Sequence, residues 1–183
     1  MRILFILALA AAVAPAAVAS AAQDAPPVIA VRSVDGVYTV DARFEIAAPP
    51  ETVREVLTDY AGIPRFMPDV RKSIVRERRG ARVLVEQEAA SKILMFSKTV
   101  HLLLDVHEGV QVLTFRDTCG RSFSEYAGAW TLEAGGAGTA VAYTLTAKPT
   151  FSVPPFMIKR LLDSNARNTI EYLRAETALR HAR

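Results

Sequence analysis

Aromatic residues in a stretch of alternating side chains are the first candidates for binding chemistry. Tyr126 and Trp130 lie four apart within residues 123–133, so in a strand both side chains point to one face. A phenol or an indole joins an apolar ring to one hydrogen-bonding group, which can orient a ketone or quinone oxygen. Tyr143 has the same properties. The alternative interpretation is that these aromatics are core residues bonded to the backbone.

Two polar residues near the C-terminal end are further candidates. Asn165 and Thr169 interrupt an apolar stripe one helical turn apart. A buried amide or hydroxyl is unfavourable unless it is hydrogen-bonded, so we expect each side chain to have a partner. That partner is either a ligand or, alternatively, the other residue, a water molecule or a strand.

Large apolar side chains occur in segments that we expect to be loops or short turns. They are Phe66, Met67, Met95 and Phe96. Methionine and aromatic side chains adapt to irregular apolar ligands, so these residues are candidates for the rim of a binding site. Packing in the core is the alternative.

The sequence contains no evident catalytic constellation of the nucleophile and base, phosphate-loop or paired-carboxylate kinds. His101 and His107 lie on the polar face of one predicted strand, and His181 is near the C-terminal end, so we expect surface positions. Arg116 precedes Asp117 at a strand end and is the best candidate for stabilising an enolate. An exposed ion pair is the alternative.

Composition predicts one domain with a substantial core, because the 183 residues are 51% hydrophobic and 22% charged. The single cysteine, Cys119, excludes a disulfide framework, and we expect it to be a buried small apolar group. No Cys/His cluster has metal-ligand spacing, so the sequence predicts no metal or other cofactor. The 22 Lys and Arg residues against 19 Asp and Glu predict a mixed surface that does not bind nucleic acid.

The first residues have the pattern of a secretory signal peptide. Arg2 is followed by an apolar stretch and then by small residues up to Ala22. We expect cleavage near Ala19 or Ala22 and export, with a periplasmic location. An uncleaved membrane anchor is the alternative.

Strand signals dominate the chain after the predicted signal peptide. Residues 28–34 and 37–46 flank Asp35-Gly36, a strong hairpin signal, and the second strand alternates apolar and polar residues. Pro49-Pro50 then starts a helix, and a second short turn follows. Six more strands are predicted at 71–79, 82–90, 98–107, 110–117, 123–133 and 139–148. Their short connections require antiparallel pairing, and we expect residues 91–97 to form a loop.

A long amphipathic helix is predicted from Pro154-Pro155 to about residue 182. Its apolar side is predicted to carry Ile158, Leu161, Leu162, Asn165, Thr169, Tyr172, Leu173 and Leu179. Acidic and basic residues alternate on the opposite side, which is most simply a solvated face; transient contact with a membrane surface is the alternative.

Geometry predicts unfilled space between this helix and the sheet. One helix is about 10 Å across, whereas six or seven strands about 4.8 Å apart span nearly 30 Å. Either large side chains fill the difference or an apolar cavity remains.

Three segments resemble one known family. Residues 53–60 with Phe66-Met67-Pro68, the stretch Gly128-Ala129-Trp130-Thr131-Leu132, and the final helix resemble the START-like SRPBCC superfamily, nearest its polyketide cyclase and coenzyme-Q-binding branch. The resemblance covers about residues 37–180. It implies an α+β helix-grip fold, in which a seven-stranded curved antiparallel sheet surrounds the C-terminal helix, with two short helices after the first long strand. It also implies a hydrophobic cavity, because members bind lipids, quinones, polyketides or other apolar molecules, and a few catalyse cyclisation or dehydration.

These observations predict an exported, monomeric, non-enzymatic carrier of an apolar small molecule. We expect a signal peptide at 1–22, a linker and hairpin strand at 23–36, and the ligand-binding domain at 37–183. The alternatives are a cyclase or dehydratase in which Tyr126, Trp130 and Arg116 polarise a carbonyl, and an interaction module with a filled core. The predicted ligand-binding residues are Phe66, Met67, Met95, Phe96, Tyr126, Trp130, Tyr143, Leu162, Asn165, Thr169 and Tyr172.

Overall fold

The computed structural model describes residues 25–93, 96–136 and 138–183. The predicted signal peptide lies outside these residues. The strands are β1 (Val28–Val34), β2 (Val37–Ile46), β3 (Val70–Arg79), β4 (Arg82–Ile93), β5 (Phe96–Glu108), β6 (Val112–Asp117), β7 (Phe123–Gly135) and β8 (Gly138–Pro149). The helices are α1 (Pro50–Thr58), the 3₁₀ turn η1 (Tyr60–Gly62), α2 (Ile63–Phe66) and α3 (Pro155–His181).

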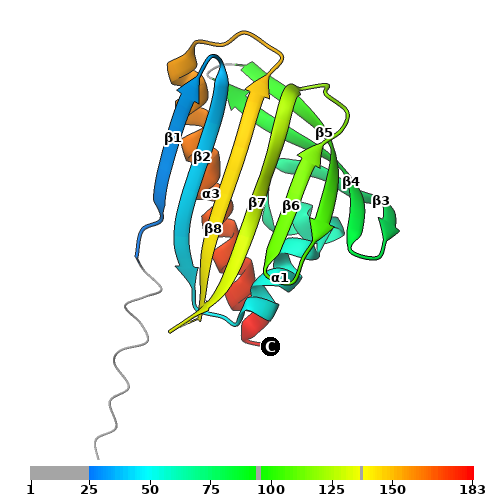
Figure 1. Cartoon of the computed structure of the whole chain (residues 1–183), viewed down its shortest axis with the longest axis vertical. Coiled ribbons are helices and arrows are strands. Elements are labelled where there is room, and N and C mark those ends of the chain that lie inside the picture. Colours follow the sequence, from blue (N-terminus) through cyan, green and yellow to red (C-terminus); the bar gives the residue numbers. More distant parts are fainter. Residues whose placement is uncertain (1–24, 94–95, 137) are drawn as a thin grey trace, which may run out of the picture.

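The described strands form one antiparallel sheet in the order β1-β2-β8-β7-β6-β5-β4-β3. Figure 1 shows that the sheet is curved and that α3 runs behind β1, β2 and β8, with α1 beside the C-terminal part of α3. The expected seven strands become eight because the hairpin strand β1 pairs along the edge of β2. The loop expected at 91–97 is also corrected, because β4 continues to Ile93 and β5 begins at Phe96, and these two residues pair.

The hairpin between β1 and β2 follows directly from its sequence. Asp35 and Gly36 have φ values of 50° and 75°, and two positive φ angles define the turn whose twist matches paired strands. In β2 the predicted apolar face is confirmed, since Tyr38, Phe44 and Ile46 are all 7% exposed or less. This face forms part of the core beneath α3.

The inward side of α3 is divided between a buried seam and a flank that borders the cavity, rather than forming the single apolar face that was predicted. The buried residues are Ile158, Leu162, Ala166, Ile170, Leu173 and Thr177. A second set, including Asn165, Thr169 and Tyr172, lies beside this seam and faces the interior space described below. The prediction for Leu179 is wrong: this side chain is 61% exposed, because the buried seam passes through Thr177 in the last turns instead.

Arginine side chains fix α3 to the rest of the fold. Arg174 donates to the backbone oxygens of Glu45 and Ala25, both at 3.1 Å. Arg180 donates to the Asp59 carboxylate at 2.8 Å, at the junction of α1 and η1. The helix is therefore held both at the β1–β2 edge of the sheet and at the short helices. No helix in the described residues is both long enough and apolar enough to cross a membrane.

One buried hydroxyl in α3 predicts a stabilising substitution. Thr177 is fully buried, and its Oγ1 has no hydrogen-bond partner among the described residues. Because an unpaired buried hydroxyl is unfavourable, we expect Thr177→Val to raise the free energy of unfolding by about 1 kcal/mol. Urea denaturation measures this, with Thr144→Val at an exposed position of β8 as the control. Destabilisation by Thr177→Val would contradict the prediction.

Candidate functional site

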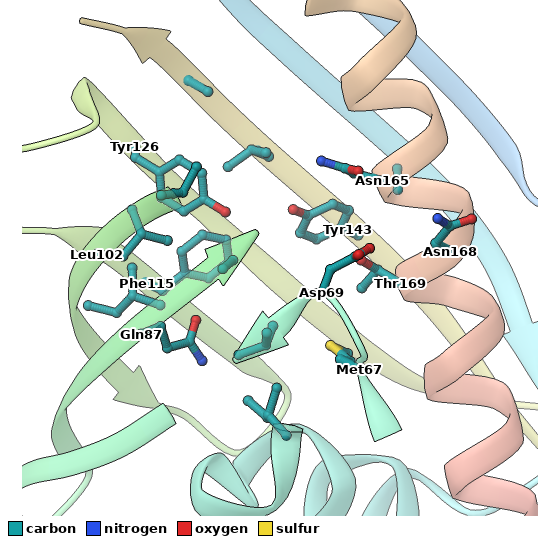
Figure 2. A pocket seen from close by; sticks show the side chains of 18 of the residues that line it. Met67, Asp69, Gln87, Leu102, Phe115, Tyr126, Tyr143, Asn165, Asn168 and Thr169 are labelled. Atoms are coloured by element: carbon teal, nitrogen blue, oxygen red, sulfur yellow. The ribbon is translucent and has the colours of Figure 1, made fainter. Parts of the chain in front are cut away.

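A cavity of about 300 Å³ lies between the concave face of the sheet, α3 and the short helices. Figure 2 shows side chains from these layers pointing into it. The volume is at the lower end of the range for small-molecule sites. The predicted mismatch between one helix and a wide sheet therefore leaves space.

Aromatic rings on β7 and β8 form one wall of the cavity. Trp130 and Tyr143 are directly paired across the two strands and stack, with ring centroids 4.1 Å apart and planes at 24°. Tyr126 lies 4.9 Å from the ring of Phe123 and 5.9 Å from that of Phe115. The prediction that Tyr126 and Trp130 share one face is confirmed, because both line the cavity.

Gly128 gives this wall its shape. It lies between Tyr126 and Trp130 on β7, where a Cβ would be 2.6 Å from Cζ of Phe115 and 2.2 Å from the backbone oxygen of Thr144. Any side chain there would displace the Phe115 ring. The alternation of aromatic, glycine and aromatic residues therefore lets a ring from β6 lie against the β7 backbone.

Polar side chains gather where α3 faces the segment between α2 and β3. Asn165, Asn168 and Thr169 lie on α3, and Met67 and Asp69 lie opposite them (Figure 2). Asn165 and Asp69 are exposed, whereas Asn168 and Thr169 are half-buried. The expectation of a buried amide at Asn165 is thus wrong, because this part of α3 borders the open side of the cavity.

Most residues predicted for the site line the same cavity. They are Phe66, Met67, Tyr126, Trp130, Tyr143, Leu162, Asn165, Thr169 and Tyr172. Met95 lies outside the described residues, and for Phe96 only its place at the start of β5 is described. Ligand contact by any of these residues stays a prediction.

Other cavity-lining residues were not among those predicted. Leu102 and Leu104 alternate with His101 and His107 along the chain, on a face where every second residue is apolar, so this pattern could have identified them. Asp69, Gln87 and Asn168 gave no such signal, because polar residues are ordinarily assigned to the surface.

Two polar groups of the lining are held by protein partners. Gln87 donates to Oγ of Ser73 at 3.2 Å. The Tyr60 hydroxyl donates to Glu108 at 2.8 Å, and Arg78 donates to both oxygens of the same carboxylate at 2.9 and 3.2 Å. Burial alone raises the pKa of Glu108, but the hydrogen bonds from Arg78 and Tyr60 outweigh it and lower the pKa below its ordinary value.

The depressed pKa of Glu108 predicts acid sensitivity. A carboxylate whose pKa is lower in the folded chain stabilises the fold above its unfolded pKa, and this stabilisation disappears as the pH falls through the folded pKa. We expect Glu108→Gln to cost about 1 kcal/mol at pH 7, because Arg78 is 47% exposed and solvent weakens the pair. The difference from the wild type should shrink below about pH 4.3.

Denaturation at several pH values measures this difference. Glu125→Gln, at an exposed position of β7, is the control and should change little at any pH. A difference for Glu108→Gln that stays constant from pH 7 to pH 3 would contradict the assignment.

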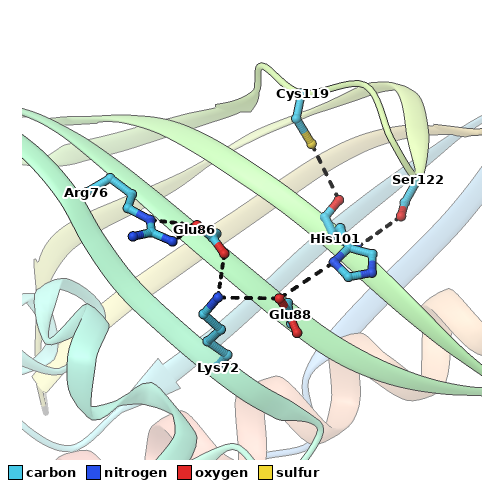
Figure 3. Close-up of polar contacts among 7 residues, drawn as sticks. All are labelled: Lys72, Arg76, Glu86, Glu88, His101, Cys119 and Ser122. Carbon is cyan, nitrogen blue, oxygen red and sulfur yellow. Dashed lines mark hydrogen bonds and ion pairs between the residues drawn. The ribbon is translucent and has the colours of Figure 1, made fainter.

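The opposite face of the sheet carries charged residues. Lys72 lies 2.6 Å from Glu86 and 3.5 Å from Glu88, and His101 lies 3.8 Å from Glu88 (Figure 3). His101 lies on this outer face, as expected, with its side chain 32% exposed. Cys119 is half-buried rather than buried, with Sγ 3.7 Å from the His101 oxygen.

The arrangement of Arg116 overturns one predicted mechanism. Its side chain is exposed, whereas its neighbour in β6, Phe115, lines the cavity. Side chains alternate along a strand, so Arg116 points to the outer face and does not meet Tyr126 or Trp130 inside. The predicted carbonyl-polarising group of these three residues is therefore wrong. His107 and His181 are exposed, as expected. Within the described ranges, no three His, Cys, Asp or Glu side chains cluster as metal ligands would.

A curved antiparallel sheet closed by a long C-terminal helix around an apolar cavity is the helix-grip fold of START-like proteins. The chain belongs to the family described as polyketide cyclase / dehydrase and lipid transport, whose model matches residues 38–177. This confirms the resemblance found in the sequence. No curated protein matches the sequence.

Solved structures support the fold. A protein from Thermus thermophilus is 26% identical, with a TM-score of 0.65, and the match covers 77% of this chain and 97% of that one. A STAR-related lipid transfer protein from Xanthomonas axonopodis is 20% identical, with a TM-score of 0.65 over 86% of this chain and 97% of that one. The Zhui aromatase/cyclase from Streptomyces sp. R1128 is 19% identical, with a TM-score of 0.62 over 79% of this chain and 95% of that one.

Proposed function

We propose that this chain is a binding protein that carries an apolar small molecule in the cavity beneath α3. The cavity itself carries the proposal: about 300 Å³ is left open beside a hydrophobic core, and its lining is mostly apolar. Empty apolar space lowers stability, because the lining loses contacts that side chains would otherwise make. A ligand that fills the space restores those contacts.

The relatives support the same conclusion. The family description includes lipid transport, and one similar structure is named as a lipid transfer protein. The alternative of an interaction module with a filled core is disfavoured by the open volume. Cyclase or dehydratase activity also occurs in the family, but Arg116 is outside the cavity, and we therefore favour binding without turnover.

Export is part of this proposal. Its support is the N-terminal order of a charged residue, an apolar stretch and small residues up to Ala22. N-terminal sequencing of protein recovered from the exporting compartment tests it, with a new N-terminus at Ser20 or Gln23 expected. A start at Met1 would contradict cleavage. Transient membrane contact stays a prediction.

Mass spectrometry of bound molecules tests the binding function. Protein purified from the exporting compartment is extracted with organic solvent, and one apolar compound in near-equal molar amount is the expected result. The protein is also incubated with apolar aromatic probes of the size of naphthalene derivatives. An extract without any such compound, together with no uptake of the probes, would contradict the proposed function.

A further inference from the structure

The hydroxyl groups of Tyr126 and Tyr143 are uncommitted polar groups inside the cavity. Tyr143 is only 8% exposed, and neither hydroxyl has a hydrogen-bond partner among the described residues. Figure 2 shows both oxygens directed into the same part of the cavity. Thr177 Oγ1 is the fully buried side-chain oxygen without a partner among the described residues, so the two phenol oxygens are reached from the cavity, and a bound molecule can accept hydrogen bonds from them.

Two other polar side chains of the lining differ from them, because each has a protein partner. The Tyr60 hydroxyl is engaged with Glu108 at 2.8 Å, and Gln87 donates to Ser73. Tyr60, in η1, is therefore a counterpart elsewhere in the lining of the same cavity. It has the same chemistry but a protein partner.

Packing holds the two free phenols in place before any ligand arrives. Tyr143 stacks on Trp130 at 4.1 Å, and Tyr126 is flanked by Phe123 at 4.9 Å. Both lie on neighbouring strands of the rigid sheet rather than on a loop. Donors fixed in this way lose little freedom on binding, which favours affinity.

Both phenols keep their protons at physiological pH. Burial, with a smaller contribution from Asp117, raises the pKa of Tyr126 to about 12. Burial, together with the neighbouring Tyr126, raises the pKa of Tyr143 well above its ordinary value. Each hydroxyl is consequently a hydrogen-bond donor.

The described lining of the cavity has no cationic side chain to pair with a buried anion. The ionisable side chains that line it, in the described part of the chain, are four tyrosines and Asp69, with no Lys, Arg or His. A carboxylate taken into such a space loses its hydration without gaining a cation. Asp69, exposed at the open side, adds repulsion.

We infer that the cavity selects neutral, largely apolar molecules whose buried end carries a carbonyl oxygen, which accepts hydrogen bonds from Tyr126 and Tyr143, and that it rejects the corresponding carboxylates. This selectivity rests on the proposed binding function. Ketones, esters and quinones meet the requirement, whereas fatty-acid anions do not. A chain too long for about 300 Å³ extends past Asp69 and Asn165 into solvent.

Three probes of nearly equal size separate the contributions of the apolar rings, the carbonyl oxygen and a negative charge to binding affinity. They are 2-acetylnaphthalene, 2-ethylnaphthalene and 2-naphthoate, measured by equilibrium dialysis at pH 7. We expect wild-type protein to bind the ketone about tenfold more tightly than the hydrocarbon, since each hydrogen bond adds a few-fold in affinity. The carboxylate should bind more weakly than either.

Phenylalanine variants identify the donors. The double variant Tyr126→Phe/Tyr143→Phe should lose about tenfold in ketone affinity while its affinity for 2-ethylnaphthalene stays unchanged. Tyr60→Phe is the matched control: it also removes a cavity-lining hydroxyl, but it should leave the ratio of ketone to hydrocarbon affinity unchanged. Circular dichroism and thermal unfolding verify that each variant is folded.

The outcomes distinguish this inference from the proposed function. An unchanged ratio in the double variant, or a carboxylate bound as tightly as the ketone, overturns the selectivity and leaves apolar binding in place. Failure of all three probes to bind the folded wild-type protein overturns the binding function itself, and the selectivity with it.

Discussion

Replacing Leu162 with Asp is expected to lower the free energy of unfolding by about 4 kcal/mol and to abolish uptake of 2-ethylnaphthalene. Leu162 is 9% exposed, belongs to the main core and also lines the cavity from α3. The substitution removes a buried apolar side chain and introduces a charge into the hydrophobic core. For a domain of this size the corresponding fall in Tm is about 8–16 °C.

The same helix provides the control. Leu179 is 61% exposed, so Leu179→Asp should change the free energy of unfolding by less than about 0.5 kcal/mol and leave probe uptake unaffected. Urea denaturation and equilibrium dialysis measure the two properties. Unchanged unfolding of the Leu162→Asp variant would mean that α3 is not docked against the sheet through this side chain.

The different outcomes for Leu162 and Leu179 indicate what helical periodicity can predict. Spacing along the chain places both residues on an apolar side of α3, and it correctly identifies the side that faces inward at Leu162. It does not reveal that this side is divided between a seam against the core and a flank toward the cavity. That division depends on where the sheet curves away from the helix, which is a property of the assembled fold.

Strands were predicted more reliably than the polar parts of the site. In β2 and β5 every second residue is apolar, which identifies the buried face, since a one-residue slip would turn these side chains to the outside. The exposure of Asn165 and the position of Asp69 follow from which edge of the cavity stays open. No local pattern encodes that edge, because it is set by the segment between α2 and β3 lying across from α3.

For Tyr126 and Tyr143, the sequence predicts the orientation of the side chains but not their hydrogen bonding. Their shared orientation follows from strand parity and from the pairing of β7 with β8. The sequence does not predict whether their hydroxyls have hydrogen-bond partners. Tyr60 has the same side chain, and its hydroxyl is bound to Glu108, 48 positions away in the sequence. Long-range pairing of this kind is visible only in the folded chain.

Filling the cavity without disturbing the core is the second large effect that we expect. Ala89 lies on β4 between Val70 and Val100, and all three residues line the cavity. In Ala89→Phe the new ring occupies space that a ligand would use. The affinity for 2-acetylnaphthalene should therefore fall by more than about tenfold, while the free energy of unfolding stays equal or rises by about 1 kcal/mol from the added apolar burial.

When a ligand site is an open cavity, filling it with a side chain lowers ligand affinity without lowering the free energy of unfolding. Leu162→Asp lowers both properties, whereas Ala89→Phe separates them, so the two variants together distinguish a ligand cavity from a packing defect. Ala175→Phe, at an exposed position of α3, controls for the added aromatic surface and should change neither property. Undiminished probe binding by the folded Ala89→Phe variant would place the binding site elsewhere on the molecule.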